Sequence, residues 1–101
     1  MTEQDLVSWA LDCYFASWEI EQAEAILESE GMDAAVEHLR NQAISSQRGY
    51  GGPDMPSYDT RNGRIEIRDA TTGIGAEPDL TYDIKWFARR KLESLYQPKL
   101  L

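Results

Sequence analysis

Few residues in this chain have the types and spacing that catalysis requires. The only histidine, His38, follows Glu37, and the only cysteine is Cys13. A nucleophile and its base must lie in hydrogen-bond contact, and the spacing gives no reason to bring Cys13 or a serine to His38. One thiolate and one imidazole also fall short of a zinc-type ligand set. The sequence therefore predicts a protein that is not an enzyme and holds no metal or cofactor.

Carboxylates are plentiful, and their distribution predicts the kind of partner. The chain carries 18 acidic and 10 basic side chains, which gives a net charge of −8. Every Lys and Arg lies in residues 40–101, so residues 1–39 carry a charge of −10 and the remainder +2. Such a charge repels a phosphate backbone from the first helices and favours a basic partner surface, or the chain's own basic C-terminal element. The ten acids of the first part are Glu3, Asp5, Asp12, Glu19, Glu21, Glu24, Glu28, Glu30, Asp33 and Glu37.

Two sets of residues are predicted to bind a partner. The acidic set lies on the N-terminal helix and comprises Asp12, Glu19, Glu21, Glu24 and Glu28. The second set lies on the last helix and comprises Tyr82, Trp86, Arg89 and Arg90. Tyr, Trp and Arg are enriched at binding hot spots, so the second set is interpreted either as a recognition patch for protein or single-stranded nucleic acid, or as Arg stacked on aromatic rings within the fold.

The N-terminal helix is expected to run from Glu3 to Ser29, and a break near Ser17 is the alternative. Thr2 and Asp5 have the spacing of a capping box at its start. At about 100° per residue its apolar residues fall on two separate arcs, and the second arc needs a further element or another molecule to cover it. The sequence therefore predicts a homo-oligomer, as a two-fold dimer, with Trp9 or Trp18 at the interface.

The middle of the chain is expected to form a short helix and a loop. Asp33 caps a helix that runs to about Ser46 and buries a stripe of Val36, Leu39 and Ala43. Residues 47–56 hold three Gly and two Pro, and this composition predicts a loop without regular structure.

A β-hairpin is expected around Asn62-Gly63, because both residues tolerate a positive φ. A two-residue turn between residues 57–61 and 64–68 pairs Thr60 with Ile65 and Tyr58 with Ile67. Residues 69–76 are then expected to form a second loop.

The last element is predicted to be a helix from Leu80 to about Tyr96, because its apolar residues recur at helical spacing. Residues 80–86 also alternate in polarity, so the alternative is a strand that pairs with residues 64–68, in which case Tyr82 and Trp86 turn inward. The predicted fold is one α+β domain over residues 1–101, with three helices and a small β-hairpin between the second and the third.

These observations predict a protein-interaction module. A short acidic chain with aromatic surface and no catalytic constellation resembles, in general type and through no single motif, the small inhibitors that phages and mobile elements use against host systems, such as anti-defence proteins. The predicted partner is a protein with a basic or nucleic-acid-binding surface, and the alternative is a regulatory protein that binds nucleic acid through the Arg-rich last helix. No apolar run reaches the roughly 18 residues of a membrane span, and a single cysteine suits a reducing compartment, so the expected location is the cytoplasm.

Overall fold

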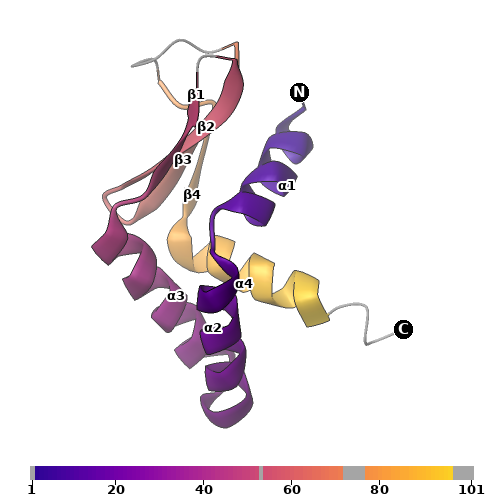
Figure 1. The fold of residues 1–101 in the computed structure, drawn as a ribbon, viewed down its shortest axis with the longest axis vertical. Helices are drawn as coiled ribbons and strands as arrows, with labels where there is room; N and C mark the ends of the chain where they lie inside the picture. Colours follow the sequence, from indigo (N-terminus) through magenta and orange to yellow (C-terminus); the bar gives the residue numbers. More distant parts are fainter. Residues whose placement is uncertain (1, 53, 72–76, 97–101) are drawn as a thin grey trace.

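Four helices and a four-stranded sheet make up the computed structural model, which describes residues 2–52, 54–71 and 77–96 (Figure 1). The helices are α1 (Glu3–Cys13), α2 (Ser17–Glu30), α3 (Met32–Ser46) and α4 (Ile84–Tyr96). The strands are β1 (Gly49–Gly52), β2 (Met55–Arg61), β3 (Arg64–Arg68) and β4 (Leu80–Asp83). The prediction of three helices and a small hairpin between the second and third is wrong, because a complete antiparallel sheet follows α3.

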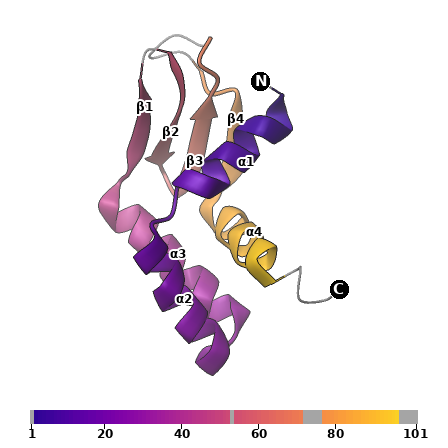
Figure 2. The same ribbon diagram turned by 45° about the vertical axis from the view of Figure 1, so that its right-hand side comes forward.

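The predicted N-terminal helix is divided into α1 and α2 by an extended residue, Ala16, with φ −71° and ψ 154°. The predicted capping box is confirmed at the start of α1, where Thr2 and Asp5 exchange two hydrogen bonds of 3.2 Å. The break sends the two helices to different neighbours. α1 lies across the sheet and contacts β3, whereas α2 packs against α3 (Figure 2).

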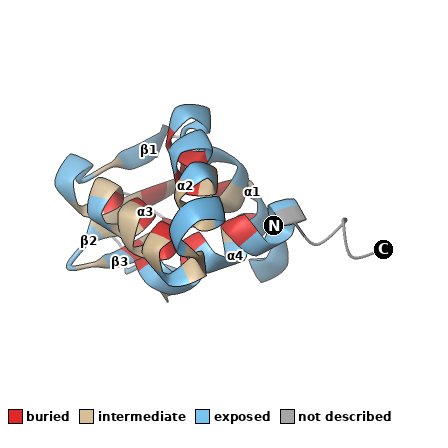
Figure 3. Ribbon diagram, turned by 90° about the horizontal axis from the view of Figure 1, so that it is seen from below, coloured by how far each residue is buried: buried red, intermediate tan, exposed pale blue. Residues whose placement is uncertain are grey.

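α2 and α3 form a helical hairpin with a single glycine at its turn. Gly31 has φ +97°, a backbone conformation that favours glycine. The predicted stripe of α3 is confirmed, because Val36, Leu39 and Ala43 are all buried. Figure 3 shows that buried positions of α2 and α3 lie on their inward sides while their outer turns are exposed.

The predicted hairpin register is confirmed between β2 and β3. Thr60 pairs with Ile65 and Tyr58 with Ile67 around a turn in which Asn62 has φ 54° and Gly63 has φ 74°. The sheet has the order β1-β2-β3-β4, and all its pairs are antiparallel.

The predicted loop over residues 47–56 is wrong for β1 and for the start of β2. Glycine here permits close backbone contact, because a Cβ on Gly51 would collide with Ser57 and a Cβ on Gly49 would lie 2.8 Å from an Asp59 oxygen. The expected loop over residues 69–76 lies in part outside the described residues, which omit 72–76.

The first four residues of the predicted last helix form β4. Leu80 pairs with Ile67 and Tyr82 with Ile65, so the strand alternative is correct for this segment. The helix starts at Ile84, where the Asp83 carboxylate accepts a 2.8 Å hydrogen bond from the Lys85 N–H.

The core lies between α1, the inner face of the sheet and α4. Three sheet residues, Tyr58, Ile65 and Ile67, are buried with Leu6 of α1 and Phe87 of α4. The helical hairpin adds the buried side of α3, which packs against both α2 and α4. This arrangement leaves one side of α2 and one side of α4 facing outward.

Candidate protein-interaction surfaces

One outward row on α2 combines an aromatic side chain with carboxylates. Trp18, Glu21, Ala25 and Glu28 follow one another at helical spacing, and all four are exposed; this row is called the α2 face below. Trp18 is 53% exposed, the largest exposed fraction among the described large hydrophobic residues. The opposite side of α2 buries Ile20 and Ala23 in the core.

The carboxylates of the α2 face are available to a partner. Within residues 2–52, 54–71 and 77–96, Glu21 and Glu28 have no ion-pair or hydrogen-bond partner for their carboxylates. Asp12, at the end of α1, is also exposed, and Glu24 is half-buried. Four of the five predicted acidic residues thus keep some access to solvent.

Glu19, the fifth predicted acid, differs from the other four, because its side chain is buried and already paired within the chain. It is 1% exposed, and Arg48 donates a hydrogen bond of 2.7 Å to each of its carboxylate oxygens. The Ala16 N–H donates a third at 3.0 Å. Burial raises the pKa of Glu19, but the hydrogen bonds from Arg48 and Ala16 outweigh burial, and the net pKa lies below the ordinary value. Glu19 therefore uses its carboxylate within the chain, where it holds the first turn of α2 to Arg48.

Arg48 joins this first turn to the start of the sheet. Its guanidinium also donates a 2.8 Å hydrogen bond to the Tyr14 carbonyl and lies 5.2 Å from the centre of the Tyr14 ring. Because Arg48 is 29 residues from Glu19, no local spacing pointed to this pair. These contacts connect the first turn of α2 to the start of the sheet.

The two tryptophans that were predicted at an oligomer interface differ in their surroundings. Trp9 is half-buried and contacts the rings of Tyr50 and Tyr58, at centroid distances of 5.9 and 5.7 Å. Trp18 is the more exposed of the two.

A second outward surface lies where β4 meets α4. The rings of Tyr82 and Trp86 stack at 4.7 Å with an interplanar angle of 12°, and the guanidinium carbon of Arg90 lies 6.0 Å from the Trp86 ring. The expectation that a strand here would turn both aromatics inward is wrong for Trp86, because the strand ends at Asp83 and leaves Trp86 on the first turn of α4. Trp86 is 44% exposed, whereas Tyr82 is half-buried.

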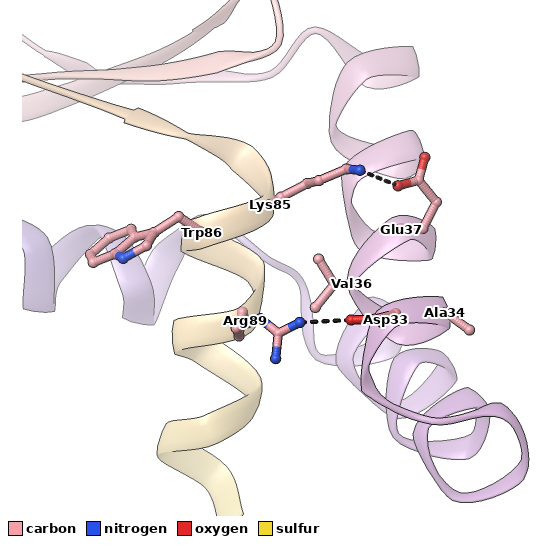
Figure 4. A pocket seen from close by; sticks show the side chains of 7 residues that line it. All are labelled: Asp33, Ala34, Val36, Glu37, Lys85, Trp86 and Arg89. Carbon is pink, nitrogen blue, oxygen red and sulfur yellow. Dashed lines mark hydrogen bonds and ion pairs between the residues drawn. The ribbon is translucent and has the colours of Figure 1, made fainter.

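A shallow groove of about 620 Å³ runs between α3 and α4 beside Trp86 (Figure 4). Two ion pairs cross it, Lys85 to Glu37 at 3.1 Å and Arg89 to Asp33 at 2.7 Å. The predicted partner-binding residue Arg89 is therefore already paired within the chain. By contrast, Arg90 and Lys91 form no ion pair with any side chain that the structure describes.

Other candidate sites are not assembled. The His38 imidazole lies 3.2 Å from the Gln22 side-chain oxygen, and Cys13 is exposed at the end of α1. Among the described residues, no group of three or more His, Cys, Asp or Glu side chains is placed to hold a metal ion. The described helices are all too short or too polar to cross a bilayer. Comparisons with protein-family models, with curated proteins and with solved structures find no match for this chain.

Proposed function

We propose that this chain is a non-enzymatic protein-interaction module whose α2 face binds a basic surface on a partner protein in the cytoplasm. The observation that carries the proposal is the exposed Trp18 on the same row of α2 as two unpaired carboxylates, Glu21 and Glu28, within residues 1–39, which have no Lys or Arg. An exposed tryptophan supplies the apolar anchor of a binding hot spot, and the carboxylates select a basic surface around it. A nucleic-acid-binding surface of the partner would be basic, so binding there would make this chain an inhibitor or regulator of the type that phages and mobile elements use.

The contacts that hold α2 in place within the chain support this proposal. The Glu19–Arg48 pair fixes the turn that carries Trp18, and the other side of α2 is buried against α3. A helix that is already ordered loses little conformational entropy on binding, so its few contacts contribute more to affinity. The proposal also includes self-association of the chain, with Trp18 in the contact.

The rival function, nucleic-acid binding through α4, has less support. Trp86 and Arg90 provide a stacking platform and a cation, as single-strand binding requires. However, Lys85 and Arg89 are neutralised by Glu37 and Asp33, and a chain of net charge −8 repels a phosphate backbone.

The proposal is tested by capture of partners from nuclease-treated lysate of the native host. The wild-type chain is compared with a Glu21→Lys/Glu28→Lys variant, and bound proteins are identified by mass spectrometry. The matched control is Asp54→Lys/Glu77→Lys, which makes the same change of charge at two exposed positions away from α2. We expect a basic protein that the wild type and the control retain and the α2 variant loses. Equal loss in the control, or equal retention by all three chains, would contradict the proposal.

A further inference from the structure

Trp18 differs from the other two tryptophans in what surrounds its ring. Trp9 contacts two tyrosine rings, and Trp86 stacks on Tyr82 with the guanidinium carbon of Arg90 6.0 Å from its ring. Within residues 2–52, 54–71 and 77–96, Trp18 has neither an aromatic contact nor a cation over its ring. It is also 53% exposed. Trp18 is therefore accessible to a side chain of another protein.

A free carboxylate lies one turn after this ring on α2. Glu21 follows Trp18 by three residues, a spacing at which Cβ atoms are about 5–6 Å apart. The Cα–Cβ bonds of a helix tilt toward its N-terminus, so that of Glu21 is directed toward the turn that carries Trp18. Among the described residues, the Glu21 carboxylate has no hydrogen-bond or ion-pair partner.

The cations that follow on α3 and at the start of the sheet are already paired. Residues 1–39 contain no Lys or Arg. Arg40 of α3 forms an ion pair with Glu37 at 3.6 Å, and the Arg48 side chain is 16% exposed and bound to Glu19. The α2 face therefore keeps its negative charge for a cation from another molecule.

Elsewhere in the fold, an aromatic ring and a carboxylate together hold an arginine. The Arg48 guanidinium donates a 2.7 Å hydrogen bond to each carboxylate oxygen of Glu19 and lies 5.2 Å from the centre of the Tyr14 ring. Trp18 and Glu21 are the same two kinds of group without the guanidinium. Among aromatic side chains, tryptophan attracts a cation most strongly. The α2 face is therefore suited to an arginine.

Arginine fits this pair of groups better than lysine does. A guanidinium is planar, so it can stack on the indole while the N–H groups at its edge donate two hydrogen bonds to a carboxylate. An ammonium is a compact, strongly hydrated charge that has no flat face. The ring and the carboxylate together therefore favour arginine, whereas a carboxylate alone accepts either cation.

We propose that the α2 face recognises an arginine of the partner protein, whose guanidinium stacks on Trp18 and pairs with Glu21. This inference rests on the proposed function and names the residue type by which the partner is selected. Glu28 lies seven residues after Glu21, about 10 Å along the helix, and the residues one turn before it, Glu24 and Ala25, have no aromatic ring. A cation at Glu28 can therefore be lysine or arginine, and the requirement for arginine is confined to the end of the α2 face that carries Trp18.

Two helical peptides of matched charge serve as probes for the full chain. Each is alanine-rich and carries two cations seven residues apart, the spacing of Glu21 and Glu28, as arginines in one peptide and as lysines in the other. A fluorescent label on the peptide gives the affinity by anisotropy, and the indole N–H signal of Trp18 in NMR spectra reports contact with the ring. At low salt we expect the arginine peptide to bind the wild type about threefold to tenfold more tightly than the lysine peptide.

Variants separate the ring from the carboxylate, and circular dichroism checks the fold of each. Trp18→Leu should bind both peptides equally, because the charges remain and the ring is lost. Glu21→Gln should weaken binding of the arginine peptide about threefold, whereas Glu30→Gln, at an exposed acid of α2 outside the α2 face, should weaken it less than about twofold. Trp86→Leu is the control for the other exposed indole and should keep the preference for arginine.

Three results would overturn the proposal: equal affinity of the wild type for both peptides, a preference for arginine that survives in Trp18→Leu, or no binding of either peptide at millimolar concentration. A Trp18 signal that shifts with the concentration of the chain and not with peptide would make a second copy the occupant and would also overturn it. The capture experiment separates this inference from the proposed function. Capture that Glu21→Lys/Glu28→Lys abolishes, without a preference between the peptides, contradicts only the arginine assignment, and a preference without capture contradicts only the partner function.

Discussion

Removal of the Glu19 carboxylate is expected to destabilise the fold more than removal of any other acidic side chain on α2. The side chain is 2% exposed and accepts three hydrogen bonds, two of 2.7 Å from Arg48 and one of 3.0 Å from the Ala16 N–H. Breaking a buried ion pair by removing one partner costs about 3–5 kcal/mol, because the other charge loses its compensation.

The expected cost for Glu19→Ala lies at the lower end of that range. The Arg48 side chain is 16% exposed and keeps the Tyr14 carbonyl and the Ser46 hydroxyl as acceptors, at 2.8 Å each. We therefore expect a loss of about 3 kcal/mol, which corresponds to a fall in Tm of roughly 10–25 °C for a domain of this size.

Urea unfolding followed by circular dichroism measures this loss, with Glu30→Ala as the control. Glu30 is exposed on the same helix, so its removal should change the free energy of unfolding by less than about 0.5 kcal/mol. A double-mutant cycle with Arg48→Ala should give a coupling energy above about 1.5 kcal/mol. A Glu19→Ala cost below about 1 kcal/mol, or additive effects in the cycle, would refute the reasoning.

Three further predictions follow from the same structure. The folded-state pKa of Glu19 is lowered, so its contribution to stability is complete above the ordinary glutamate pKa of about 4.3 and is lost as the pH falls through the folded value. The difference in unfolding free energy between the wild type and Glu19→Gln, measured in urea, should therefore disappear below about pH 4. A difference that stays constant with pH would count against the Glu19–Arg48 pair. Trp86→Ala should cost under about 1.5 kcal/mol in thermal unfolding because the side chain is 44% exposed, against about 3–5 for the buried Phe87→Ala, and equal costs would place Trp86 in the core. Gly51→Ala should cost about 1–3 kcal/mol, because φ is +139° and the added Cβ meets Ser57, whereas Gly52→Ala, with open space around it, should change stability by less than about 0.5; similar losses at both positions would contradict the close backbone contact.

Local signals in the sequence predicted the elements that depend on neighbouring residues. Asn62-Gly63 has the backbone freedom that a two-residue turn requires, and the register of β2 and β3 followed from it. Thr2 and Asp5 similarly predicted the start of α1. In both cases the interacting residues are within a few positions of one another.

Contacts between distant residues decided the rest. The composition of residues 47–56 indicated a loop, but glycine at position 51 lets β1 approach β2. Residues 80–86 fit the spacing of a strand and of a helix equally well. Pairing of Leu80 and Tyr82 with β3 decides for a strand at residues 80–83, and this pairing is not visible in the local sequence. In the candidate site, Trp18 and Trp86 proved exposed, while Glu19 was buried by an arginine that no spacing associates with it.

The placement of α1 against the sheet has a consequence for the order in which the chain assembles during synthesis. The α2–α3 hairpin joins neighbouring segments and can pair as soon as residue 46 has emerged from the ribosome. α1 is made before the sheet that it contacts: its Trp9 packs against Tyr50 and Tyr58, and the helix also contacts β3, more than fifty residues later. The apolar residues Leu6 and Ala10 of α1 therefore stay exposed to solvent until most of the chain has been synthesised. During this interval a chaperone or a second nascent copy can bind them.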